Sequence, residues 1–269
     1  MRVITHPGPV VAQRVDLQPC EAVALRLTLR AGLSLSTAIA GALRDAGFDY
    51  GYLRLDGLAL APLVYVTPAP APGDGHAAWY SARHSLSEAL LSHAGAHLGL
   101  REGKAFVHCH GLWQQGGMGH LLCDDCIVAS DTQVRGWGIA GAGLVADADP
   151  ETQFTLFRPK AMGTGKPNAA LLTLRPNQDI SMALDAVGSD FGAARVEGIG
   201  SLVGSRFSDA TDLASYATEI LLLDATTGAA GTMLSAASVG FDGQPQRGTL
   251  IAGQNAICVT AELLLLSEV

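Results

Sequence analysis

Three histidines near the middle of the sequence have the residue type and spacing of a metal site. His108 and His110 are separated by one residue, so on a β-strand, where side chains alternate between faces, both imidazoles project from the same side. A glycine-rich turn at 116–119 then allows the chain to reverse, and His120 lies near the start of the returning strand. We therefore expect the three imidazoles to converge on one point.

The ligand type of this cluster indicates which ions it would bind. Neutral imidazole is well matched to zinc, so His108, His110 and His120 predict a site for zinc or another divalent metal. Three protein ligands leave one coordination position open, which suits water, a small anion or catalysis. The alternative is that these histidines hydrogen-bond in a buried pocket or along an oligomer axis. No acid or base partner is evident from spacing, because the aspartates at 124–131 can face solvent.

Two other pairs of potential metal ligands are less well arranged. Cys123 and Cys126 form a single Cys-x-x-Cys motif, but a strand places positions three apart on opposite faces, so we expect buried thiols. His93 and His97 share one face of a predicted helix, and without a Glu-containing motif we expect a solvated polar face there.

Three aromatic residues near the histidines have two possible roles. Trp79, Tyr80 and Trp113 can line a ligand pocket, or they can pack at a subunit interface. We favour the interface, because Trp113 falls in the predicted turn, where an exposed aromatic ring is costly unless it is covered.

The elements that position the histidines belong to a plan that occurs twice in the chain. Three pairs of similar segments recur in the same order at a varying offset, which indicates a duplicated domain with different loop lengths. These pairs are residues 27–30 and 172–175, which are identical, residues 54–60 and 195–202, and residues 119–134 and 248–263.

Each copy of this plan combines strands with one amphipathic helix, expected over 31–47 in the first copy and within 171–192 in the second. This pattern predicts an α+β fold of two tandem domains, each a mainly antiparallel β-sheet packed with one or more α-helices. We place the domains at residues 1–148 and 166–269. The segment 141–153 is small and acidic and is expected to form a surface connection between them, with the boundary near residues 145–168.

The first copy also carries an insertion. Residues 67–75 are rich in proline and glycine and predict a loop. Residues 85–98 follow, and Ser85 with Glu88 forms a capping-box pattern ahead of apolar residues, so we expect a helix there.

Composition restricts the class of protein. The 269 residues are 48% hydrophobic, and 17 Lys and Arg residues are outnumbered by 25 Asp and Glu residues, so no basic footprint for nucleic acid is visible. The apolar runs are too short to span a membrane. The five cysteines are odd in number and the first residues lack the apolar core of a secretory signal, so we expect a cytoplasmic protein.

The histidine segment and its repeat resemble a known family, the plants and prokaryotes conserved (PPC or PCC) domain. The residues that carry the resemblance are His-Cys-His at 108–110, Gly-His-Leu-Leu at 119–122 and Thr-Ala-Glu at 260–262. Together with the strand, helix and strand before them, they cover nearly the whole chain as two tandem copies. The resemblance implies an α+β fold with a mainly antiparallel sheet and a trimer or trimer-like assembly.

In plants this domain accompanies an AT-hook that contacts DNA, so the resemblance also raises DNA as a partner. The chain contains no Arg-Gly-Arg-Pro core of such a hook. The second copy has Thr249 opposite His120, and all eight histidines precede residue 121. We therefore expect the second domain to be a structural or interface copy and the chemistry to be confined to the first.

These observations leave three hypotheses. The first is a cytoplasmic, oligomeric, tandem PPC-like protein with a three-histidine site for a metal or small ligand. The second is a DNA-associated regulatory protein, which the family resemblance implies and the acidic charge opposes. The third is a metal-dependent enzyme that acts on a small substrate.

Overall fold

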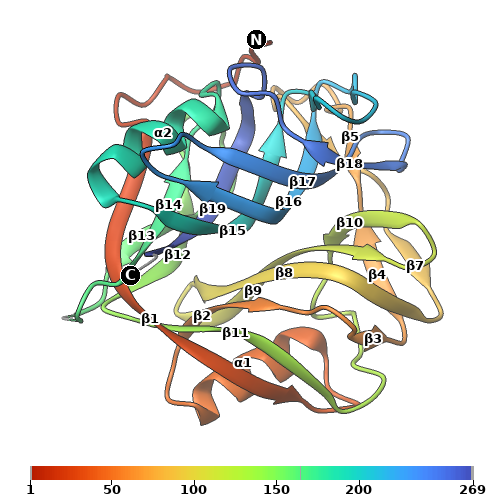
Figure 1. The fold of residues 1–269 in the computed structure, drawn as a ribbon. Helices are drawn as coiled ribbons and strands as arrows, with labels where there is room; N and C mark the ends of the chain where they lie inside the picture. Colours follow the sequence, from red (N-terminus) through yellow and green to blue (C-terminus); the bar gives the residue numbers. More distant parts are fainter. Residues whose placement is uncertain (1, 164, 268–269) are drawn as a thin grey trace.

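The computed structural model describes residues 2–163 and 165–267, which form a four-layer arrangement (Figure 1). Two β-sheets face each other, and one helix covers the outer side of each sheet. The helices are α1 (Leu35–Asp45) and α2 (Ile180–Phe191), and the strands are β1 (Val15–Leu29), β2 (Tyr50–Arg54), β3 (Ala59–Leu60), β4 (Leu63–Val66), β5 (Pro68–Ala69), β6 (Trp79–Tyr80), β7 (His84–Leu86), β8 (Ala89–Arg101), β9 (Lys104–Trp113), β10 (Gly117–Leu121), β11 (Thr132–Ala140), β12 (Ala142–Ala148), β13 (Thr155–Ala161), β14 (Ala169–Leu174), β15 (Ala194–Leu202), β16 (Thr218–Thr227), β17 (Met233–Val239), β18 (Pro245–Thr249) and β19 (Ile257–Ser267). The predicted α+β class is confirmed.

The two sheets have the same strand order, as the internal repeat predicted. In the first sheet the antiparallel pairs run β1, β11, β2, β8, β9 and β10. In the second sheet they run β14, β19, β15, β16, β17 and β18. Strand β9, which carries His108 and His110, therefore corresponds to β17, and β10 corresponds to β18.

Each helix begins at a side-chain cap and buries one apolar face against its own sheet. The Ser34 side chain accepts a hydrogen bond from the Thr37 amide at the start of α1, and Asp179 caps α2 in the same way. The apolar residues on the buried faces of both helices belong to two separate cores, one within each half of the chain. No helix in the described part of the chain has the length and apolar character needed to cross a membrane.

Strand β1 belongs to both sheets. Its first part, Val15–Cys20, pairs with β14, and its second part, Glu21–Leu29, pairs with β11. The two sheets are also joined by an apolar layer between their facing sides, which includes Leu112 from β9 and Leu221 from β16. The histidine strand β9 therefore lies at the junction of the two sheets.

The helix predicted over 85–98 is wrong, because this segment forms β7 and most of β8. Gly95, within this segment, and Gly99, just after it, account for the difference. Other segments of the same chain approach both glycines closely. An added Cβ at Gly95 would lie 2.2 Å from the Tyr52 hydroxyl, and one at Gly99 would lie 2.4 Å from the Leu144 carbonyl oxygen. Glycine is also a poor helix former, so the capping-box pattern is outweighed by sheet pairing with β2 and β9.

The surface connection predicted over 141–153 is also wrong in part. Residues Ala142–Ala148 of this segment form β12, which pairs antiparallel with β13 and extends the first sheet by pairing in parallel with β8. The acidic residues in the turn of this pair are not solvated. Asp149 is only 4% exposed and Glu151 only 1%, so each needs a cationic partner.

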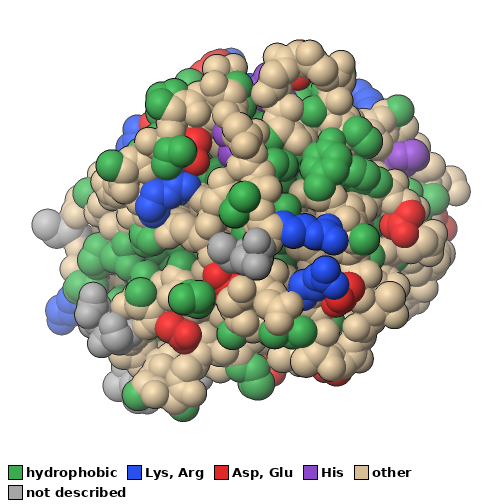
Figure 2. Space-filling model, turned by 90° about the horizontal axis from the view of Figure 1, so that it is seen from above, with side chains coloured by type: hydrophobic (Ala, Val, Ile, Leu, Met, Phe, Trp, Pro, Cys, Tyr) green, Lys and Arg blue, Asp and Glu red, His purple; other side chains and the backbone are tan. Residues whose placement is uncertain are grey.

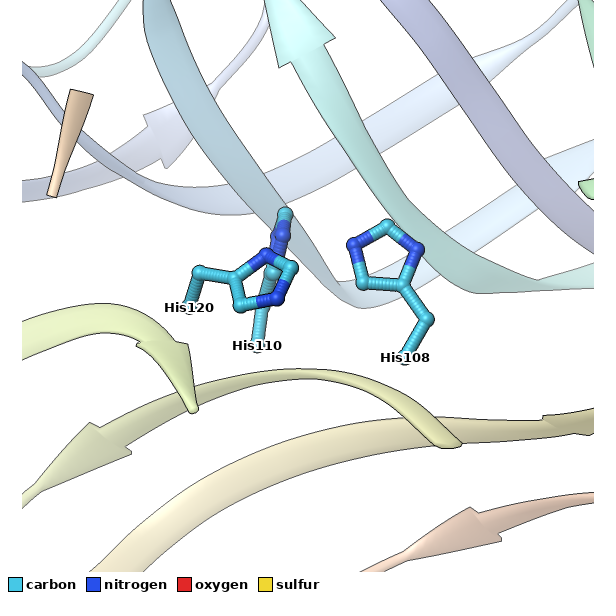
Figure 3. A group of neighbouring side chains, drawn as sticks. All are labelled: His108, His110 and His120. Carbon is cyan, nitrogen blue, oxygen red and sulfur yellow. The ribbon is translucent and has the colours of Figure 1, made fainter. Parts of the chain in front are cut away.

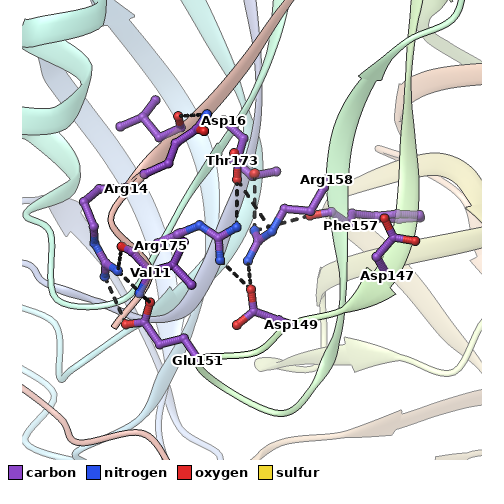
Figure 4. Close-up of polar contacts among 12 residues, drawn as sticks. Val11, Arg14, Asp16, Asp147, Asp149, Glu151, Phe157, Arg158, Thr173 and Arg175 are labelled. Atoms are coloured by element: carbon purple, nitrogen blue, oxygen red, sulfur yellow. Dashed lines mark hydrogen bonds and ion pairs between the residues drawn. The ribbon is translucent and has the colours of Figure 1, made fainter. Parts of the chain in front are cut away.

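These partners form a buried ion network (Figure 4). Oδ2 of Asp149 accepts hydrogen bonds from Arg158 at 2.6 Å and Arg175 at 2.5 Å. Asp16 of β1 lies 3.3 Å from Arg175, so the network joins β1, β13 and the end of β14. Burial opposes ionisation of Asp149, but the hydrogen bonds from Arg158 and the Thr152 amide outweigh it and hold the pKa of Asp149 well below its usual range.

Replacement of Asp149 tests this network. We expect Asp149→Asn to lower the free energy of unfolding at pH 7 by roughly 3 kcal/mol, because two buried arginines lose their shared carboxylate. A carboxyl group with a depressed folded-state pKa stabilises the protein above its unfolded pKa, and this contribution is lost as the pH falls toward the folded-state pKa. Urea unfolding should therefore show the difference between the two proteins shrinking below about pH 4. A constant difference down to pH 2 would contradict the assignment.

Candidate metal centre

The three predicted histidines come together on adjacent strands (Figure 3). His108 and His110 project from the same side of β9, and His120 of β10 lies directly opposite His110 in the strand pairing. The ring centroids are 4.8 to 5.4 Å apart, and one nitrogen from each ring lies within 4.8 Å of the other two. The alternation of side chains along a strand and the reversal at the glycine-rich turn thus produce the expected cluster, which could hold a metal ion.

The second sheet fixes the orientation of two of these rings. Nδ1 of His110 lies 2.8 Å from the Ile220 carbonyl oxygen, which can only accept, so Nδ1 carries the proton. Nδ1 of His108 likewise lies 2.6 Å from Oε2 of Glu262 and donates to that carboxylate. In both rings the lone pair is therefore on Nε2, which is the arrangement that metal-bound histidines adopt.

The ring nitrogens that make no hydrogen bond are suited to bind a metal ion. Nε2 of His108 and Nε2 of His110 are buried and have no hydrogen-bond partner among residues 2–163 and 165–267. A buried polar atom without a partner is costly, and a cation at this point would satisfy both nitrogens. His120 is anchored by Tyr80, whose hydroxyl lies 3.2 Å from Nδ1. The donor set of three neutral imidazoles matches zinc and other divalent ions of similar softness.

Burial keeps two of the histidines in the state that binds metal. Burial, together with the charge that His108 carries when protonated, lowers the pKa of His110 to about 3. The same causes hold the pKa of His120 well below its usual value. Both rings are therefore neutral at physiological pH, so a metal ion does not have to displace a proton from them.

A buried carboxylate from the second sheet faces the histidines. Oε1 of Glu219, on β16, lies 3.6 Å from Nε2 of His110 and 3.7 Å from Nδ1 of His120. Burial raises the pKa of Glu219 to about 8, although the nearby Tyr80 hydroxyl and the His120 backbone lower it. Glu219 thus adds an oxygen donor to the three nitrogens.

The cluster opens into a cavity of about 430 Å³ between the two halves of the chain. This volume is within the range of pockets that hold small molecules. The walls are largely aromatic and aliphatic, and Tyr80 and Glu219 lie beside the histidines. The aromatic side chains of the wall are Trp79, Tyr80, Phe106, Phe154 and Phe157.

The other sequence candidates lie apart from this site or have structural roles. Cys123 and Cys126 are free and buried, as expected. His93 and His97 lie on β8, where residues four apart are about 13 Å apart along the strand and do not chelate one ion. His97 is fully buried, and its Nε2 lies 3.0 Å from the Glu262 carbonyl oxygen.

Two of the three aromatic candidates line a ligand pocket, and Trp113 takes neither of the roles considered. Trp79 and Tyr80 line the cavity beside the histidines. Trp113 is not in an exposed turn, because β9 extends to include it. Its ring is buried in the first core and packs on Tyr65 with centroids 4.6 Å apart.

The expectation that the second domain has no part in the site is wrong, because Glu219 and Glu262 both come from it. Glu262 falls in the Thr-Ala-Glu element at 260–262, which the sequence had already singled out. Glu219 was missed. The only related pattern is the likeness of Ser-Glu-Ala-Leu-Leu at 87–91 to Thr-Glu-Ile-Leu-Leu at 218–222, but Glu88 precedes β8 and is exposed, whereas Glu219 lies within β16 and is buried.

Comparisons with known proteins find similarity only to solved structures, and only over part of the chain. No protein-family model and no curated protein matches the chain. Solved structures that match include a metal-containing protein from Archaeoglobus fulgidus, with 18% identity over 54% of this chain and 98% of that chain and a TM-score of 0.42. A plant- and prokaryote-conserved (PPC) protein from Pyrococcus horikoshii has 14% identity over 57% of this chain and 100% of its own, with a TM-score of 0.39.

A proposed DNA-binding protein from Ralstonia eutropha matches with 17% identity over 49% of this chain and 88% of its own, and a TM-score of 0.38. Each of these matches spans about half of the chain.

The hydrogen bond between His108 and Glu262 can be tested separately from the histidines. We expect Glu262→Gln to weaken divalent metal binding about 10-fold, because the carboxylate orients the ring and increases the basicity of Nε2. Competition with a fluorescent zinc chelator measures the change. An unchanged affinity would contradict this role for Glu262.

Proposed function

We propose that the protein binds a divalent metal ion, zinc by the nature of its ligands, through His108, His110 and His120. The observation that carries this proposal is the pair of buried Nε2 atoms of His108 and His110, which have no hydrogen-bond partner in the described part of the chain. The nearness of His120 to both rings and its low pKa support the same conclusion.

The surrounding residues would give a bound ion a defined environment. A zinc ion in such a site acts as a Lewis acid and can lower the pKa of bound water. Glu262 and the Ile220 carbonyl group hold two imidazole rings in place, and Tyr80 holds the third. The aromatic residues in the wall of the cavity beside the site suit a small ligand with an apolar part.

A metal-dependent enzyme is the second candidate, and the cavity of about 430 Å³ beside the histidines favours it. A screen of small hydrolysable substrates with metal-loaded and metal-free protein would reveal such an activity.

Binding to DNA is less well supported by the surface. On the face shown in Figure 2, Lys and Arg side chains are interspersed with Asp and Glu side chains. Several exposed arginines are paired with aspartates, as Arg83 is with Asp125 and Arg206 is with Asp212. A duplex-binding surface requires clustered positive charge.

The proposal extends to the organisation of the protein. We propose two tandem PPC-like domains at residues 1–148 and 166–269, with the first part of β1 completing the second sheet. By the PPC resemblance we also propose self-association in a trimer or trimer-like assembly, which light scattering coupled to size-exclusion chromatography would measure. The five buried free thiols suit the reducing cytoplasm that the sequence predicted.

Elemental analysis provides the direct test of the metal site. We expect the purified protein to contain about one equivalent of metal per chain, and His110→Ala to lose most of it because one of three imidazoles is removed. A metal-free wild-type protein that takes up neither zinc nor cobalt on titration would contradict the proposal. His93→Ala is the matched control, because His93 is exposed on the adjacent strand β8 and should leave the metal content unchanged.

A further inference from the structure

Glu219 belongs to the second sheet and faces both His110 and His120. Its placement suggests that it takes part in the metal centre. Resting on the proposed metal site, we propose that the Glu219 carboxylate is the fourth protein ligand. The ion would then bridge the two halves of the chain, with three nitrogens from the first sheet and one oxygen from the second.

The distances support direct ligation. In a tetrahedral zinc site with bonds of 2.0–2.1 Å, two ligand atoms are roughly 3.3 Å apart. Oε1 of Glu219 lies 3.6 Å from Nε2 of His110, the nitrogen of that ring without a hydrogen-bond partner in the described residues, so only small side-chain movements would bring the two atoms to that spacing. Carboxylate oxygen is also a common zinc ligand.

The polar groups closest to the buried Glu219 carboxyl group, apart from the imidazoles, are the Tyr80 hydroxyl and the His120 backbone, and both lower its pKa. Glu219 is 3% exposed, and neither carboxylate oxygen has a hydrogen-bond partner of normal geometry within the described residues. Other buried acids are partnered: Glu197 contacts Arg54 at 2.8 Å and Arg195 at 2.9 Å, and Glu262 contacts His108. A buried acid beside three neutral rings is costly unless a cation occupies the space between them.

The backbone fixes the carboxylate in this position. Glu219 is paired with Ser201 of β15 on one side and with Val239 of β17 on the other, so β16 is held from both directions. The next residue, Ile220, supplies the carbonyl group that orients His110. Strand β16 thus orients the ring of His110 through the Ile220 carbonyl group and places a Glu219 oxygen beside that ring.

This assignment changes what the centre can do. A site with three histidines alone keeps an open position for water, whereas three histidines and a glutamate form a closed four-coordinate site. In a closed site the ion would connect the two sheets, because it would bind three histidines of the first sheet and Glu219 of the second. With four protein ligands on the ion, a small molecule in the cavity would find no open coordination position.

Cobalt provides a spectroscopic test on the full-length protein. The metal-free wild type, Glu219→Gln and two controls would be titrated with Co²⁺, and zinc affinity would be measured by competition with a chelator. Glu88→Gln makes the same change just before the corresponding strand of the first sheet. Glu197→Gln makes it at another buried carboxylate between the sheets, away from the histidines.

We expect zinc affinity to fall on the order of 100-fold in Glu219→Gln. Removing a residue that only hydrogen-bonds to a ligand weakens metal binding roughly 10- to 100-fold, and a direct ligand should reach at least the upper end of that range. Both controls should bind zinc as the wild type does. Azide should alter the visible spectrum of cobalt in Glu219→Gln, where a solvent molecule replaces the carboxylate, and leave that of the wild type unchanged.

The outcomes separate this inference from the proposal on which it rests. A wild type that binds no metal overturns both. A wild type that binds metal but whose cobalt spectrum responds to azide has an exchangeable position, which overturns ligation by Glu219 and leaves the three-histidine site standing. An equal loss of affinity in Glu197→Gln would also overturn it, because the effect would then arise from weakened packing between the sheets. The azide measurement needs no variant, so it decides the question even if Glu219→Gln does not fold.

Discussion

The structure depends on the face-to-face packing of two sheets that bury ionisable groups between them. Burial removes these groups from water, so each must be neutral or must find a partner of opposite charge. Glu197 finds Arg54 on the opposite sheet, and Asp149 finds two arginines at the edge of the interface. At the histidines the same constraint is met by neutral imidazoles, whose free nitrogens create the demand for a cation. The candidate centre is thus a consequence of how the two halves meet.

Much of the fold was predictable from local pattern and internal repetition. The two helices follow capping residues and apolar spacing, and the duplicated segments fall on corresponding strands of the two sheets. The failures occurred where tertiary contacts outweigh local preference. Residues 85–98 have a helix-start pattern, yet Gly95 and Gly99 fit a crowded sheet. The acidic turn near Asp149 looks solvated in sequence, and only its distant partners, Arg158 and Arg175, make burial possible.

The candidate site was predictable to the extent that it is local. Strand alternation and one turn were enough to bring His108, His110 and His120 together, because the three lie on adjacent strands. The contribution of Glu219 depends on how one sheet packs on the other, and no spacing along the chain specifies that packing.

The double pairing of β1 has a consequence for how the two domains can be separated. Val15–Cys20 hydrogen-bonds to β14, which belongs to the second half of the chain, although the rest of β1 belongs to the first. A fragment cut at the midpoint of the chain would leave β14 as an open strand edge, and such edges readily add strands from other molecules. The two tandem copies are therefore not independent of each other, because strand β1 pairs with strands of both. The solubility of each copy depends on the presence of the other.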